Sequence, residues 1–172
     1  FFGNGIVPEG TGFFLNNQLS SFTLTATSAS YVKPFKQPVS HIMPTIIMKD
    51  GNPYATLGSP GSMRIPSAVL QVILNMIDFG MDIQTAINMP RFYSYACAST
   101  DYSSTSKDIY VERALYKTVK EGLTAMNYNV IVEGSGDIDL YFGGVQGIRF
   151  IYEEGKLHGG ADPRRDGKAL GY

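Results

Sequence analysis

The chain has 172 residues, of which 44% are hydrophobic, and this length and composition predict a single folded domain, residues 1–172, with a substantial core. Its formal net charge is −1 and the Lys and Arg residues are scattered along the sequence, which argues against a nucleic-acid partner. With Cys97 as the only Cys and with His41 far from His158, the sequence predicts no disulfide framework, no metal site and no cofactor.

The N-terminal part combines one apolar run with a long polar segment. The chain begins with Phe1 and not with Met, so we interpret it as a processed or truncated piece of a longer protein. Residues 12–17 form an apolar run bounded by Gly and Asn, which predicts a buried strand. Residues 23–39 are rich in Ser, Thr and Pro, which predicts a surface loop. No apolar run in the sequence has the length of a membrane span.

The middle of the chain predicts a β-hairpin followed by two helices. Residues 44–48 and 54–57 are apolar and flank a Lys-Asp-Gly-Asn turn, so they predict two antiparallel strands. A helix is predicted from Pro66 to a stop at Gly80, and a shorter helix over residues 83–89. The buried face of the first helix is predicted to carry Val69, Leu70, Ile73 and Ile77.

The C-terminal half predicts one more long helix among strands. Residues 112–126 carry apolar side chains at helical spacing and predict a helix. Residues 129–133 predict a strand, and residues 140–160 predict a hairpin that turns at residues 153–155. Because strands cluster and a few helices accompany them, we expect a layered α+β domain without alternating βαβ units.

A glycine-rich turn, residues 58–62, joins the predicted hairpin to the first predicted helix. Gly permits close backbone approach and positive φ, and a helix begins with N–H groups that have no partner within the helix. The turn is therefore either a tight connection or a site whose N–H groups hold an anion or an oxyanion. It is not a phosphate-binding P-loop, since no Gly-Lys-Ser/Thr follows. Arg64 beside it is either a structural Arg or a partner for a substrate carboxylate.

Other polar groups are weaker candidates for a site. Ser40 and His41 are adjacent, and neighbours in sequence rarely point at one another, which disfavours a Ser-His-Asp triad built on them. Asp137 and Asp139 alternate as strand residues do, which suits either acid-base chemistry or an exposed strand entry. The two Gly at residues 143–144 predict a bulge or a close backbone approach. A C-terminal charge cluster predicts solvated ion pairs, and it comprises Asp162, Arg164, Arg165 and Asp166.

Four stretches in succession resemble the small subunit of gamma-glutamyltranspeptidases. They are residues 1–22, 39–65, 69–92 and 159–172, and the most specific element is FLNNQ followed by PTI, KDG, GSPG and RI. The resemblance covers nearly the whole chain. It implies an α+β fold of the N-terminal-nucleophile (Ntn) hydrolase class, an αββα sandwich, made by autocatalytic cleavage of one precursor into a large and a small subunit.

The resemblance also implies an acyl-transfer mechanism. In the family, the new N-terminal Thr of the small subunit attacks a γ-glutamyl amide, and its own α-amino group can serve as the base, which explains why no triad is found. The acyl-enzyme then passes the acyl group to water or to an acceptor amine. The family's Thr lies upstream of the segment that matches residues 2–5, and Phe1 stands at the first position, so we expect the nucleophile outside these 172 residues.

Roles for the other site residues follow from the same resemblance. Gly61 and Ser62 occupy the positions of the paired glycines whose backbone N–H groups form the family's oxyanion hole. Gln18 falls where the family contacts the substrate α-amino group. Ser40 and His41 fall on a pair of Ser residues that hold the substrate α-carboxylate, and only the first of the pair is kept.

The chain departs from the family in a way that bears on substrate choice. In transpeptidases that act on glutathione, an Asp shortly after NNQ pairs with the free α-ammonium, and here Ser21 stands in its place, which gives up roughly 1.5–3 kcal/mol. Capsule depolymerases that cut poly-γ-glutamate and cephalosporin acylases do not need that ion pair. The stretches FFGNG, GFFLNNQL, YFGGVQ and DPRRDG are closer to the capsule-depolymerase branch, which makes Arg64 and Arg165 candidates for binding substrate carboxylates.

The resemblance predicts two partners, a large subunit from the same precursor and a small or polymeric γ-glutamyl substrate, and an extracellular, periplasmic or cell-surface location. Three other interpretations stay open. One is an amidohydrolase like the glutaryl or cephalosporin acylases. Another is a non-catalytic homologue that serves as a binding protein, which the Ser at Ser62 and the missing Thr leave room for. The third is a generic α+β ligand-binding domain without acyl chemistry.

The specificity argument predicts the effect of Ser21→Asp in the complete enzyme. We expect the ratio of activity on glutathione to activity on poly-γ-glutamate to rise, because the new carboxylate can pair with a free α-ammonium. The measurement is the initial rate on each substrate under the same conditions. An unchanged ratio would contradict the argument.

Overall fold

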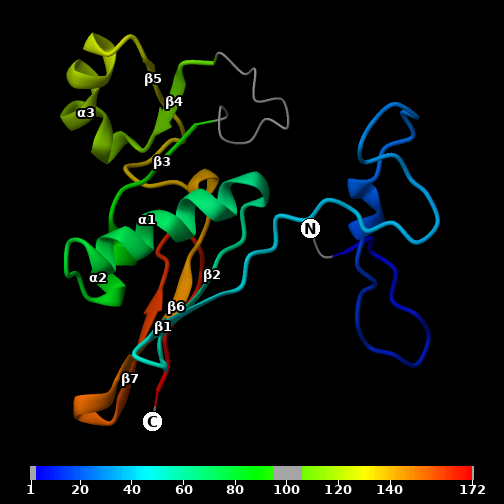
Figure 1. Cartoon of the computed structure of the whole chain (residues 1–172), viewed down its shortest axis with the longest axis horizontal. Coiled ribbons are helices and arrows are strands. Elements are labelled where there is room, and N and C mark those ends of the chain that lie inside the picture. The colour runs from blue at the N-terminus through cyan, green and yellow to red at the C-terminus, as the bar shows by residue number, and fades with distance from the viewer. Residues whose placement is uncertain (1–2, 95–105, 172) are drawn as a thin grey trace. The chain divides into compact units, whose positions relative to one another are not determined.

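The structure is a computed structural model that describes residues 3–94 and 106–171 (Figure 1). The chain divides into two compact units, Phe1–His41 and Ile42–Tyr172. Cys97, the only Cys of the sequence, lies outside the described residues. Among the described residues no helix is long and apolar enough to cross a membrane.

The first unit is mostly irregular backbone around one 3₁₀ helix, η1 (Gln18–Ser21). The loop predicted over residues 23–39 is confirmed, and its backbone is tied by an isolated bridge between Thr23 and Tyr31. Two backbone hydrogen bonds fasten Leu15 to the preceding loop, from Asn4 N to Leu15 O (3.1 Å) and from Leu15 N to Ile6 O (2.9 Å).

The prediction of a buried strand over residues 12–17 is wrong. The structure assigns no strand to this run, and Phe13 and Phe14 are 60% and 52% exposed. An apolar run becomes a buried strand only when a neighbouring strand and a packed core receive it. Within the described part of the first unit, neither is present.

A four-stranded sheet forms the centre of the second unit, with every neighbouring pair antiparallel. Its strands, in spatial order, are β1 (Thr45–Lys49), β2 (Asn52–Gly58), β6 (Gln146–Ile151) and β7 (Lys156–Ala161). Both predicted hairpins are therefore confirmed. The second hairpin turns through a 3₁₀ helix, η5 (Tyr152–Glu154), and ends at Gly155, whose φ is 62°.

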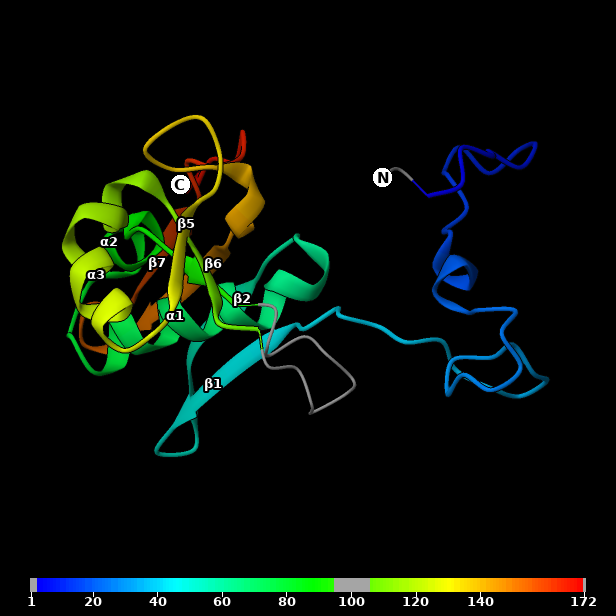
Figure 2. The ribbon, with the colours of Figure 1, turned by 90° about the horizontal axis from the view of Figure 1, so that it is seen from above.

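Two helices, α1 (Ile65–Ile77) and α2 (Ile83–Asn88), lie across one face of this sheet (Figures 1 and 2). Both were predicted, and Asp82 caps α2 by accepting a hydrogen bond from Thr85 N (3.0 Å). The hydrogen bonds to Thr85 lower the pKa of Asp82. The core between helices and sheet consists of Ala55, Leu57, Ile65, Ala68, Val69, Val72, Met76, Ile83, Ala86, Ile87 and Val145.

The buried face of α1 differs from the predicted one. Leu70 and Ile77 are 53% and 52% exposed, whereas Ala68 and Val72 are buried. The predicted Val69 is buried, and beside it lies a row of every fourth position, Ala68, Val72 and Met76, which was not predicted. A count of large apolar residues gives too little weight to Ala, which lets a helix approach a sheet closely.

A second sheet has three strands, β3 (Phe92–Tyr93), β4 (Asp108–Val111) and β5 (Asn129–Val132). The predicted helix and the strand after it are confirmed as α3 (Arg113–Ala125) and β5. However, β4 and β5 pair in parallel, so β4, α3 and β5 form a single βαβ unit within the α+β domain, which the sequence did not indicate. A parallel neighbour requires a crossover connection, which α3 supplies.

Four buried charged residues join the two sheets: Arg91, Glu112, Asp162 and Arg164. Arg164 contacts both Glu112 (2.5 Å) and Asp162 (3.1 Å), and Arg91 contacts Asp162 (2.8 Å). The prediction of solvated ion pairs is therefore wrong for Asp162 and Arg164, although Arg165 is exposed.

The carboxylates of this cluster also accept backbone hydrogen bonds from distant segments. Glu112 accepts from Arg91 N and from Asp139 N, both at 2.8 Å, and Asp162 accepts from Val145 N (2.6 Å). Burial opposes the charge on Arg164, but its contacts with the two carboxylates outweigh burial and raise its pKa. The cluster therefore fixes the loop between β5 and β6 against the end of the chain.

The cluster predicts a large loss of stability for Arg164→Ala. Removing the guanidinium leaves Glu112 and Asp162 buried with less compensation, so we expect the free energy of unfolding to fall by about 3–5 kcal/mol. Urea unfolding of the complete protein measures it. The matched control is Arg113→Ala, because Arg113 is exposed on α3, and its midpoint should stay close to that of the parent. Equal midpoints for both variants would contradict the prediction.

Candidate functional site

The glycine-rich turn lies between the end of β2 and the start of α1, and it ends in a 3₁₀ helix, η2 (Ser62–Arg64). Gly61 has φ 135° and Ser62 has φ 54°, so both residues adopt conformations that L side chains rarely take. Neither of their N–H groups donates a hydrogen bond to another described residue. Two successive N–H groups that lack internal acceptors suit an oxyanion.

The connection before β6 lies directly against this turn. Ser59 Oγ accepts a hydrogen bond from Gly144 N (3.1 Å) and donates one to Pro60 O (2.7 Å). A Cβ placed on Gly61 would lie 3.3 Å from Gly143 Cα, and one placed on Gly143 would lie 2.8 Å from Ser59 Oγ. The predicted close backbone approach at residues 143–144 is confirmed, and only Gly fits it without displacing a neighbour.

A short 3₁₀ helix in the same connection, η4 (Leu140–Phe142), contacts two Arg residues, Arg64 and Arg165. The guanidinium carbon of Arg64 lies 3.6 Å from the centre of the Tyr141 ring. Arg165 Nη2 donates to Leu140 O (3.3 Å), and its side chain is exposed. Four predicted site residues therefore lie around one backbone feature: Gly61, Ser62, Arg64 and Arg165.

The two carboxylates before η4 do not alternate along a strand. The structure places residues 133–139 outside strands, so that interpretation of Asp137 and Asp139 is wrong. Asp139 instead caps η4, because its Oδ1 accepts from Tyr141 N (2.8 Å). Asp137 accepts a hydrogen bond from Ala114 N through its backbone carbonyl (3.2 Å). The two-residue spacing of Asp137 and Asp139 therefore belongs to a loop, in which Asp139 caps η4.

The other four predicted site residues lie in the first unit. Gln18 Nε2 donates to Val39 O (2.9 Å) and to Ser21 Oγ (3.4 Å). Ser40 and His41 directly follow Val39, and both are exposed. The first unit thus brings Gln18 and Ser21 to the segment that carries Ser40 and His41.

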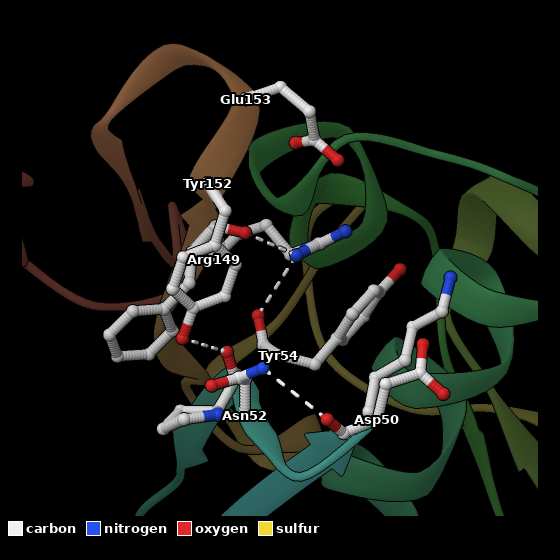
Figure 3. Close-up of a pocket in the computed structure, with 9 residues that line it drawn as sticks. Asp50, Asn52, Tyr54, Arg149, Tyr152 and Glu153 are labelled. Carbon is white, nitrogen blue, oxygen red and sulfur yellow. Dashed lines mark hydrogen bonds between the residues drawn. The ribbon is translucent and has the colours of Figure 1, made fainter.

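A pocket of about 260 Å³ lies at the other end of β2, away from the glycine-rich turn (Figure 3). Arg149 lies over the Tyr54 ring, with its guanidinium carbon 3.3 Å from the ring centre, and donates to Tyr54 O (3.1 Å). Tyr152 donates to Pro53 O (2.9 Å), so these contacts fasten β2 to the end of β6. No predicted site residue lines this pocket. Among the described residues, no group of three or more His, Cys, Asp or Glu could hold a metal ion.

Two residues at the site were not singled out from the sequence. Ser59 connects the turn to Gly144, and Tyr141 supports Arg64. Ser59 belongs to the GSPG motif, so its hydroxyl could have been considered as a hydrogen-bonding group that holds the turn. Tyr141 gives no local signal, because its contact with Arg64 joins segments far apart in sequence.

A family model and the sequences of individual relatives point to the same protein family. The family model described as Gamma-glutamyltranspeptidase matches residues 1–172. The glutathione hydrolase proenzyme of Bacillus subtilis (strain 168) is 37% identical over 99% of this chain and 27% of its own length. The corresponding proenzyme of Escherichia coli (strain K12) is 32% identical over 99% of this chain and 29% of its own length. The chain thus spans less than a third of these relatives.

Solved structures agree with the sequence comparisons. Gamma-glutamyltranspeptidase from Pseudomonas nitroreducens, complexed with L-DON, matches with a TM-score of 0.75 and 27% identity over 99% of this chain and 88% of that one. The Bacillus anthracis transpeptidase CapD matches with a TM-score of 0.70 and 29% identity, covering 100% and 87%. Cephalosporin acylase from Bacillus halodurans matches with a TM-score of 0.79 and 28% identity, covering 99% and 30%.

These neighbours confirm the α+β fold class and the Ntn-hydrolase assignment made from the sequence. The family model matches this chain from the first residue to the last, and the two proenzymes are more than 30% identical along nearly all of it. The chain belongs to the gamma-glutamyltranspeptidase family.

Proposed function

We propose that this chain is the small-subunit part of an enzyme that hydrolyses or transfers γ-glutamyl amides through an N-terminal Thr acyl-enzyme. The observation that carries the proposal is the pair of adjacent N–H groups at Gly61 and Ser62, which donate to no described residue and lie beside two Arg. Relatives named glutathione hydrolase and gamma-glutamyltranspeptidase support the same chemistry.

The proposed reaction uses the turn to stabilise negative charge. The Thr hydroxyl oxygen attacks the γ-carbonyl carbon and gives its proton to the Thr α-amine. The carbonyl electron pair moves onto oxygen, where the N–H groups of Gly61 and Ser62 donate to it, each worth about 2.7–4 kcal/mol in comparable sites. The Thr α-amine gives this proton to the nitrogen of the scissile amide, which leaves as an amine, and an ester between the γ-glutamyl group and Thr remains. Water or an acceptor amine attacks this ester and restores the Thr hydroxyl.

We propose a large subunit from the same precursor as the partner of this chain. Two apolar side chains lie on the sheet face opposite α1 and α2, since Ile46 and Ile148 each pair across the ladder with Thr56, whose neighbours Ala55 and Leu57 face the helices. Ile46 is 66% and Ile148 is 40% exposed. An apolar sheet face of this kind suits packing against another layer. The relatives are proenzymes much longer than this chain.

Substrate choice is proposed from charge. Ser21 supplies no carboxylate for a free α-ammonium, and Arg64 and Arg165 supply two cations around η4. This combination favours a substrate with several carboxylates and an acylated α-nitrogen, as in poly-γ-glutamate. The sequence resemblance to the capsule-depolymerase branch supports this choice, and the similarity to the transpeptidase CapD supports acyl transfer. The likeness to cephalosporin acylase supports the second candidate, an acylase that removes a glutaryl group.

A covalent labelling experiment tests the proposed function. We expect a mechanism-based glutamine analogue to label the complete protein once per active site, on a small subunit whose N-terminal residue is Thr. Intact-mass and peptide mass spectrometry give both the stoichiometry and the labelled residue. An uncleaved precursor that takes up no label would instead support the non-catalytic homologue.

The site geometry predicts a positioning role for the Ser59 hydroxyl, which holds the oxyanion turn. In Ser59→Ala, the bonds to Gly144 N and Pro60 O are lost, and the oxyanion donors are less firmly placed, so we expect kcat to fall about tenfold with a smaller change in KM. The control is Ser135→Ala, because Ser135 is exposed on the loop before η4. The same kcat for both variants would contradict the prediction.

A further inference from the structure

We propose that Tyr141 is a positioning residue that holds the Arg64 guanidinium beside the oxyanion turn in the orientation that binds a substrate carboxylate. The proposal rests on the proposed function and adds a residue to it. Its first support is the contact itself, in which the Arg64 guanidinium carbon lies 3.6 Å from the centre of the Tyr141 ring. This distance is well inside the range of about 6 Å in which a ring attracts a cation.

The second support is the shortness of this distance, because an edge-on guanidinium with its carbon 3.6 Å from the ring centre would press a nitrogen into the ring, so the distance favours contact through the guanidinium face. A guanidinium is planar, so a ring stacked on its face leaves its N–H groups in the plane in which a carboxylate forms a bidentate pair. A second ring, Tyr93, lies 5.8 Å from the same guanidinium carbon, and this tyrosine is buried. Arg64 is itself half-buried, so the aromatic contacts restrict a side chain that would otherwise sample many rotamers.

The third support is the fixed position of Tyr141. Asp139 caps η4 by accepting from Tyr141 N, and Asp139 N donates to the buried carboxylate of Glu112. Neighbouring rings also contact Tyr141, with Phe142 edge-on at 5.1 Å and Tyr110 at 6.1 Å between centroids. Any side chain that stacks on Tyr141 is therefore tied to the buried charge cluster through η4.

The fourth support is that the same connection touches the oxyanion turn. Gly143 ends η4 and lies so close to Gly61 that a Cβ on Gly61 would be 3.3 Å from Gly143 Cα. The ring and the oxyanion donors thus have a common rigid support. A carboxylate held by Arg64 is then placed at a defined distance from the carbonyl that reacts, which is what productive binding requires.

The test compares Tyr141→Leu with Tyr141→Phe in the complete processed enzyme. Kinetic constants are referred to the active-site concentration, titrated with the mechanism-based glutamine analogue, so that misfolded protein is not counted. We expect Tyr141→Leu to raise KM for a γ-glutamyl substrate about tenfold and to change kcat less than about twofold. Tyr141→Phe keeps the ring and should keep KM within about twofold of the parent. The matched control is Tyr116→Leu, since Tyr116 contacts Lys120 at 5.1 Å on α3, outside the site.

A double-mutant cycle with Arg64→Gln separates the possible failures. If Tyr141 acts through Arg64, the double variant should raise KM no further than Arg64→Gln alone. If Arg64→Gln raises KM but Tyr141→Leu does not, the positioning role is wrong and the proposed function stands. The same rise in KM for Tyr141→Leu and Tyr141→Phe would also overturn it. If Arg64→Gln leaves KM unchanged, the carboxylate role of Arg64 is wrong, and Tyr141 loses its role with it. Absence of labelling in the parent would overturn the function itself.

Discussion

The buried contact between Arg164 and Glu112 is the interaction on which the site depends. Glu112 begins the βαβ crossover, and its carboxylate accepts both the Arg164 guanidinium and the backbone N–H of Asp139. Asp139 caps η4, which carries Tyr141 and leads into Gly143. Through these links a charge pair in the interior sets the position of a turn at the surface.

This arrangement explains why the cluster retains charges that apolar residues could replace. A buried ion pair is weak support for stability, since desolvation offsets most of its Coulomb energy. The carboxylates of the cluster also accept directional backbone hydrogen bonds. Asp162 accepts one from Val145 N while it binds Arg164, and Glu112 accepts one from each of two segments. Apolar side chains would fill the same volume but would leave those backbone N–H groups without partners.

The sequence was sufficient for features that are local and insufficient for those that depend on distant partners. The hairpin at Asp50 and the helix that starts near Pro66 follow from turn chemistry and periodicity, and both were predicted. The family followed from motif order, and the proposed oxyanion role of Gly61 and Ser62 rests on the same order. Arg164 was taken for a surface residue, because nothing near it in sequence shows that Glu112 meets it in the interior. The run at residues 12–17 failed for the same reason, since its packing partners decide whether it is a strand.

The replacement of the family's second Gly by Ser62 no longer supports the interpretation of the chain as a non-catalytic homologue. The Ser62 φ of 54° lies in the left-handed region, which costs a non-Gly residue on the order of 1 kcal/mol, and the turn nevertheless keeps that conformation. The side chain is exposed and the N–H donates to no described residue. Because an oxyanion hole uses the backbone N–H and not the side chain, Ser62 offers the proposed site the same donor as Gly would. The departure therefore changes the strain of the turn and keeps the backbone donor that the proposed function requires.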